Sequence, residues 1–178
     1  ISVAAESAVD TPPSAGEMPE APDGVVASLV VAPDTVTAPA VTRSIIEARG
    51  ELPMPVRGRL QSLFGDTSNG VKSKGISIVT RGGAQVVTPY DGEVVFAGPF
   101  RGYGQLLIIE HGKGYHTLLA GFSRIDSILG QWLLAGEPVG VMGWGSNGGP
   151  VLYIELRRDG VAINPLPWLA VSADKVSG

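Results

Sequence analysis

The chain has 178 residues, of which 44% are hydrophobic and 17% charged, with a formal net charge of −4 and no cysteine. This composition suits one domain with a core, and the lack of cysteine excludes a disulfide scaffold, a cysteine zinc ribbon and a thiol nucleophile. Neither nucleic-acid binding nor a membrane span is predicted, because the net charge is negative and no apolar run approaches roughly 18 residues. Since the chain begins at Ile1 without a leader-like segment, we expect it to be processed or trimmed.

The N-terminal part of the chain differs in character from the rest. Residues 1–51 carry eight acidic and two basic residues, whereas residues 52–178 carry nine acidic and eleven basic ones, and all aromatic residues lie at or after Phe64. We therefore expect residues 1–50 to be an acidic linker rich in Ala and Pro, with a short helix over 41–49 that Thr42 caps and Gly50 ends. The domain is expected over 51–170, followed by a tail over 171–178.

From Pro53 onward, glycine-containing turns separate short apolar runs every eight to twelve residues, a spacing typical of an antiparallel all-β domain. One or two helical turns are predicted over 123–129. The clearest hairpin joins residues 105–110 to 115–120, where Gly112 and Gly114 supply the backbone freedom of a tight connection. The pattern predicts a compact, mostly β sandwich or small barrel with little helix. Strands are predicted over residues 76–80, 85–87, 92–97, 105–110, 115–120, 138–142 and 151–157.

Few residues of the chain could act in catalysis or bind a metal. His111 and His116 are the only histidines, and a zinc site built on them would need carboxylates such as Glu110. The alternative is that His111 is a turn residue and His116 a strand residue with a local hydrogen bond. The glycine-rich stretch 143–149 lacks the Lys-Ser/Thr pair of a phosphate loop, so we expect an inter-strand loop there.

Six segments in a fixed order resemble a known family, the LytM or lysostaphin-type zinc peptidase domain, from Phe64 to Leu169. The resemblance implies a two-sheet, mostly antiparallel β fold of the duplicated-hybrid-motif kind, with a groove floored by a metal site. The segments are FGD (64–66), SKGISI (73–78), TPYDGEVVFAG (88–98), GYGQLLIIEHGKGYHTLLA (102–120), GEPVGVMG (136–143) and GPVLYIELRRDGVAINPLPWL (149–169).

Active members of that family carry His-x-Gly-x-Asp, Tyr-x-His and His-x-His motifs. At the corresponding zinc-ligand and catalytic positions this chain has Ser73 and Ser77, then Gly121, then Val151 and Tyr153. Serine hydroxyls are poor zinc ligands, and glycine and valine are none. The resemblance therefore implies a degenerate domain that binds no zinc or other cofactor and is not an enzyme.

Among silent members, the chain resembles the murein hydrolase activators of the EnvC type, through Met54-Pro55, residues 102–114 and residues 152–169. This implies a periplasmic protein of the bacterial division site that activates N-acetylmuramoyl-L-alanine amidases during daughter-cell separation. The coiled coil with which such proteins dock on the FtsE–FtsX complex is not among these residues. The alternative is a module of the envelope that binds peptidoglycan, or a scaffold, without amidase activation.

The emptied metal site is expected to leave a groove that binds the amidase. Tyrosine and arginine often dominate interface energies. The alternatives are that Tyr153 fills the vacated cavity, that Tyr103 is a turn aromatic, and that Lys74 and Arg157 are solvated surface charges. Residues 41–49 either shield this groove or are a plain tether. The expected groove residues are Lys74, Ser77, Tyr103, Leu106, Val151, Tyr153 and Arg157.

Overall fold

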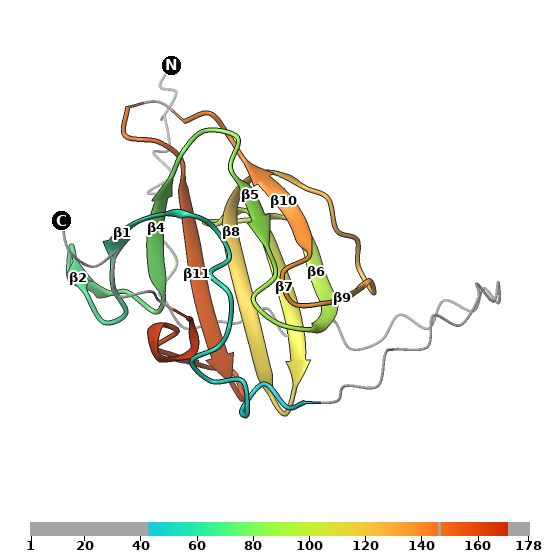
Figure 1. The fold of residues 1–178 in the computed structure, drawn as a ribbon. Coiled ribbons are helices and arrows are strands. Elements are labelled where there is room, and N and C mark those ends of the chain that lie inside the picture. The colour runs from blue at the N-terminus through green and yellow to red at the C-terminus, as the bar shows by residue number, and fades with distance from the viewer. Residues whose placement is uncertain (1–42, 146, 171–178) are drawn as a thin grey trace, which may run out of the picture. The chain divides into compact units, whose positions relative to one another are not determined.

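The computed structural model describes residues 43–145 and 147–170 (Figure 1). The expected tail and most of the expected linker, including Thr42, lie outside the described residues. Within the described ranges, no helix is long and apolar enough to cross a membrane. The elements are β1 (Gly58–Ser62), β2 (Thr67–Ser68), β3 (Val71–Lys72), β4 (Ile76–Thr80), β5 (Gln85–Val87), β6 (Gly92–Phe100), β7 (Gly104–Gly112), β8 (Tyr115–Ile125), β9 (Trp132–Leu133), β10 (Pro138–Met142), β11 (Val151–Arg158), β12 (Val161–Ile163) and the 3₁₀ helix η1 (Leu166–Trp168).

Apart from β2 and β3, which form a separate two-stranded sheet, the strands form two layers that share β8. The large layer has the order β1-β4-β11-β8-β7-β6-β9, and all of its pairs are antiparallel. The end of β8 leaves this layer and pairs with β10, which in turn pairs with β5. In Figure 1, β5 and β10 lie in front of β8, β7 and β6. The expected mostly β, antiparallel fold is therefore confirmed, with the two layers hydrogen-bonded through one long strand.

Alternation along the strands gives the large layer two different faces. Leu107, Leu119, Leu152 and Ile154 point into the main core, which the second layer covers. The residues between them point to the opposite face, where Leu106, Leu118 and Ala120 form a smaller apolar cluster. Any site on this opposite face is therefore separated from the main core by the thickness of one sheet.

The seven predicted strands are present, and β6, β7 and β8 are longer than predicted. The helical turns predicted over 123–129 are wrong. Residues 122–125 continue β8 because Phe122, Arg124 and Ile125 pair with β10, and a pairing with a strand so distant in sequence leaves no local signal.

Residues 43–52 contain turns in place of the expected helix. Their backbone hydrogen bonds span three residues, as from Glu47 N–H to the Ser44 carbonyl at 2.9 Å. Ile45, Ala48 and Leu52 are buried in the main core. The segment is also tied to the end of the domain, since Gly50 N–H donates to the Trp168 carbonyl at 2.9 Å. Residues that pack in the core of the domain therefore begin before residue 51.

Candidate functional site

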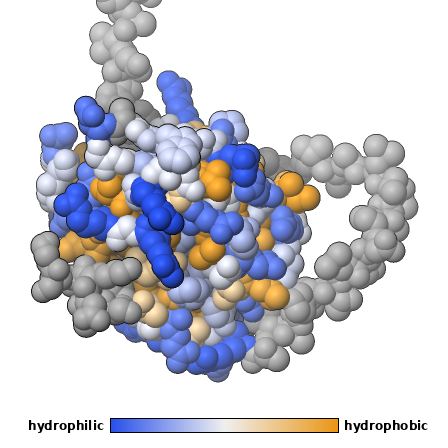
Figure 2. All heavy atoms as spheres, turned by 45° about the horizontal axis from the view of Figure 1, so that its top comes forward, coloured by the Kyte–Doolittle hydropathy of each residue, from blue (hydrophilic) through white to orange (hydrophobic). Residues whose placement is uncertain are grey.

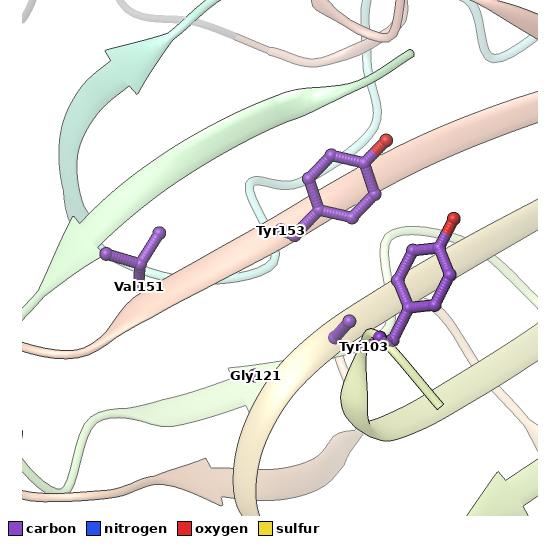
Figure 3. Close-up of a pocket in the computed structure, with 6 residues that line it drawn as sticks. Tyr103, Gly121, Val151 and Tyr153 are labelled. Carbon is purple, nitrogen blue, oxygen red and sulfur yellow. The ribbon is translucent and has the colours of Figure 1, made fainter. Parts of the chain in front are cut away.

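An open groove of about 290 Å³ lies on the face of the large layer opposite the main core. Its walls come from β8, β11 and the turn that joins β6 to β7 (Figure 3). The register places Tyr153 of β11 between Ser77 of β4 and Ala120 of β8. The pairing thus brings together segments that the sequence places far apart. The lining residues are Gly102, Tyr103, Ala120, Gly121, Val151 and Tyr153.

Two tyrosine rings form one end of the groove. The ring centroids of Tyr103 and Tyr153 are 6.1 Å apart, at an interplanar angle of 46°. Figure 3 shows both hydroxyls pointing the same way, away from Val151 and Gly121. Tyr103 also packs on Phe100, with ring centroids 5.9 Å apart. Tyr103 is thus both a turn aromatic and a wall of the groove.

A buried carboxylate joins Tyr153 to Arg157. Glu155 is fully buried on the same face of β11; its Oε2 accepts a hydrogen bond of 2.8 Å from the Tyr153 hydroxyl, and its Oε1 accepts one from Arg157 Nε. The Arg157 side chain is only 13% exposed, so the alternative of a solvated charge is wrong for this residue. Glu155 was not among the predicted groove residues, although Tyr-x-Glu-x-Arg on one strand places all three side chains on one face.

The tyrosine hydroxyls are held in their protonated form. Burial, together with the nearby Glu155 carboxylate, raises the pKa of Tyr153 far above its ordinary value. Burial and Glu155 also raise the pKa of Tyr103. Both groups therefore stay neutral at physiological pH. The Tyr153 hydroxyl already donates to Glu155, so the Tyr103 hydroxyl is the one of the two that can donate a hydrogen bond to a ligand.

The residues that the resemblance places at the zinc-ligand and catalytic positions do not fit zinc. The Ser73 hydroxyl donates to the Gly75 carbonyl at 2.8 Å, and the Tyr153 hydroxyl is bound to Glu155. Gly121 has φ +105°, and a Cβ there would lie 2.3 Å from the Val151 carbonyl oxygen. A histidine at 121 would have to push β8 and β11 apart. Among the described residues, no cluster of three His, Cys, Asp or Glu could hold a metal.

The other expected groove residues surround the lining. Leu106 is buried and pairs with Ala120, so it lies under the groove. Lys74 is exposed next to Gly75, where a Cβ would lie 2.9 Å from Cζ of Tyr153. Arg59 and Arg101, which the sequence reasoning did not single out, are also exposed; Arg59 pairs with Val79, the partner of Val151. Three exposed cations therefore come from elements around the groove.

The hypothesis of a zinc site on the two histidines is wrong. His111 is not a turn residue but a buried residue of β7, and both of its ring nitrogens are engaged. Nδ1 donates to the Asp91 carbonyl at 2.7 Å, which leaves Nε2 to accept from the Thr117 hydroxyl at 2.7 Å. Burial lowers the pKa of His111 to about 4. His111 is therefore a neutral structural residue.

The described part of residues 41–49 does not shield the groove. Ile45 and Ala48 belong to the main core, whereas Tyr153 lies on the opposite face of β11. Figure 1 shows the segment that leads into β1 running in front of β11, on the same side as β5 and β10. The shielding hypothesis is therefore contradicted, since the apolar side chains of this segment complete the core.

The comparisons with known proteins agree with this fold. The profile of peptidase family M23 matches residues 71–165, which is more than half of the chain. The murein hydrolase activator EnvC of Escherichia coli K12 is 38% identical over 124 residues, covering 68% of this chain and 29% of EnvC. The murein hydrolase activator NlpD of the same organism is 34% identical over 119 residues, covering 65% of this chain and 30% of NlpD.

The solution structure of lysostaphin is similar in fold, with a TM-score of 0.56 and 21% identity over 62% of this chain and 49% of lysostaphin. The chain spans less than a third of the length of the two activators. The resemblance to the lysostaphin-type domain is thus confirmed, and the chain belongs to peptidase family M23.

Proposed function

We propose that this chain is a non-catalytic activator of N-acetylmuramoyl-L-alanine amidases in the bacterial periplasm, acting during daughter-cell separation. The observation that carries the proposal is the groove itself, which contains three of the positions that the resemblance assigns to the family's zinc-ligand and catalytic residues and is lined by tyrosines, small residues and a valine. Two relatives that match its domain are named murein hydrolase activators. Contact with FtsE–FtsX would belong to a region outside these residues.

The groove suits an amphipathic helix of the amidase. Its apolar floor and paired tyrosine rings would take the apolar face of such a helix, and the neutral Tyr103 hydroxyl can donate a hydrogen bond to it. Arg59, Lys74 and Arg101 are exposed around the groove, which favours acidic residues on the flanks of the bound segment. Binding should therefore weaken as the salt concentration rises.

Activation requires a difference in affinity between two forms of the amidase. If a helix of the amidase occludes its own zinc cleft, the groove that captures this helix holds the enzyme open. A binding protein shifts such an equilibrium only by as much as it prefers one form. The groove must therefore bind the amidase more tightly when its helix is released than when the helix still covers the zinc cleft.

Replacing Tyr103 with alanine is expected to weaken amidase binding by about thirtyfold, the effect of removing a central aromatic anchor worth about 2 kcal/mol. Stimulation of amidase activity should fall in parallel. Tyr103 lies on a turn, and the hydrogen bonds of the Glu155 carboxylate come from other residues, so the fold should survive. Titration calorimetry with the purified amidase measures the affinity, and unfolding in urea checks the stability.

The matched control is Leu129→Ala, which removes an exposed apolar side chain on the loop between β8 and β9, outside the groove lining. This variant should bind and stimulate like the original chain. Equal binding by the Tyr103 variant would refute the groove as the amidase site. Binding of peptidoglycan with no effect on any amidase would instead favour the envelope-module alternative.

A further inference from the structure

A chain of aromatic contacts leads into the groove and ends at Tyr153. Phe96 packs edge-on against Phe100, with ring centroids 5.8 Å apart. Tyr103 joins Phe100 to Tyr153, with its ring centroid 5.9 Å from the first and 6.1 Å from the second. On the face shown in Figure 2, by contrast, hydrophobic side chains are scattered among hydrophilic ones. The position of the Tyr153 ring therefore decides how this aromatic chain meets a ligand in the groove.

The Tyr153 ring is held by residues outside the groove lining. The tip of the ring lies close to the backbone of Gly75, where a Cβ would be 2.9 Å from Cζ of Tyr153. The Tyr153 hydroxyl donates to Oε2 of Glu155 at 2.8 Å. Neither Gly75 nor Glu155 lines the groove. Both residues can therefore hold the ring without touching a ligand.

The Glu155 carboxylate depends on this hydrogen bond. Glu155 is fully buried, and the strand register places the apolar Leu118 of β8 opposite it. The Tyr153 hydroxyl donates to one carboxylate oxygen and Arg157 Nε donates to the other. A buried carboxylate that loses a donor keeps its desolvation penalty without the compensating hydrogen bond. The Tyr153 hydroxyl therefore stays on Glu155, which keeps the ring in one position.

A ring that is held in place before binding favours affinity. A side chain that a ligand must immobilise loses rotational freedom when the complex forms, and this loss weakens the complex. A ring that is already fixed avoids the loss. For one side chain the usual size of this effect corresponds to about a fivefold difference in affinity.

We propose that Glu155 is a positioning residue of the groove, which holds the Tyr153 ring in its binding position before the amidase arrives. The inference rests on the proposed amidase function, and it assigns different tasks to the two tyrosines. Tyr153 offers the partner a fixed ring, whereas the Tyr103 hydroxyl donates the hydrogen bond. The part of the amidase segment that lies against Tyr153 should therefore be apolar, with its hydrogen-bond acceptor at Tyr103.

The test compares two double variants of the full chain, Glu155→Gln/Arg157→Met and Glu155→Leu/Arg157→Met. Both remove the buried charge pair, so neither leaves an unpaired charge in the interior, and urea unfolding checks that both fold. They differ only at position 155, where a glutamine amide can still bond the Tyr153 hydroxyl and leucine cannot. In nuclear magnetic resonance spectra of the free chain, the Overhauser contact between the Tyr103 and Tyr153 rings should persist with glutamine and weaken severalfold with leucine.

Amidase affinity, measured by titration calorimetry, should be about fivefold higher for the glutamine variant than for the leucine variant. The difference should disappear when Tyr153→Phe is added to both, because no hydroxyl then remains for residue 155 to hold. Tyr153→Phe alone removes the hydroxyl and leaves the charge pair intact. It should weaken the same ring contact, so the proposal can be tested even where a double variant does not fold.

An unchanged ring contact in the leucine variant or in Tyr153→Phe would overturn the proposal, whether or not any amidase binds. Equal affinities of the two double variants, including loss of binding by both, would also overturn it. A difference in affinity that survives Tyr153→Phe would show that residue 155 acts by another route. Failure of the original chain to bind the amidase would refute the proposed function alone, because the ring contact still reports whether Glu155 positions Tyr153.

Discussion

Replacing Arg157 with alanine is expected to lower the free energy of unfolding by about 3–5 kcal/mol, the cost of leaving a buried charge without its partner. Glu155 is fully buried, and its carboxylate is held by Arg157 and the Tyr153 hydroxyl. Alanine removes one of these two donors and opens space beside the carboxylate. Urea unfolding followed by circular dichroism measures the loss.

The control for this prediction removes both charges. In Glu155→Leu/Arg157→Met, apolar side chains of similar size replace the pair, and buried ion pairs exchanged in this way are often neutral or more stable. The double variant should therefore recover most of the stability that Arg157→Ala loses. A single variant as stable as the original chain would show that the pair contributes little to stability.

A second large effect is expected from pH. Burial lowers the pKa of His111 to about 4 in the folded chain, whereas an unfolded histidine titrates near 6.5. The unfolded state therefore binds more protons between these values, and stability falls as the pH decreases from about 6.5 toward 4. A difference of this size corresponds to about 3 kcal/mol, present in full above pH 6.5 and lost near pH 4.

Urea unfolding at a series of pH values from 4 to 7.5 measures this dependence. His111→Gln should flatten the profile, whereas His116→Gln is the matched control because His116 is only half-buried on β8. The control should keep the slope of the original chain. A slope that persists in His111→Gln would assign the acid sensitivity to carboxylates.

The strands were predictable where the sequence carries a local pattern. β4 and β10 begin and end where predicted, because short apolar runs bounded by glycine or proline turns mark their limits. The end of β8 was not predictable, since Phe122 to Ile125 are held by β10 rather than by neighbours in sequence. Likewise, residues 43–49 show a helix-like sequence pattern but form a run of turns, in which Ile45 and Ala48 pack into the main core.

The site was predictable only in part, for the same reason. Motif order pointed to Gly121, Val151 and Tyr153, which do line one groove. Glu155 was missed because a charged residue is not expected in the interior, although both of its partners lie two residues away on its own strand. The contact of Tyr153 with Gly75 joins residues far apart in sequence, which no local pattern could reveal.

The proposed role of this chain, as an activator rather than a hydrolase, is tested most directly by release of dye from labelled peptidoglycan, with zinc present throughout. Three reactions are compared: the chain, a periplasmic N-acetylmuramoyl-L-alanine amidase, and the two together. The substituted zinc positions and the tyrosine-lined groove predict release only in the mixture. Release by the chain without the amidase would contradict the loss of peptidase chemistry, and a mixture no more active than the amidase would contradict activation.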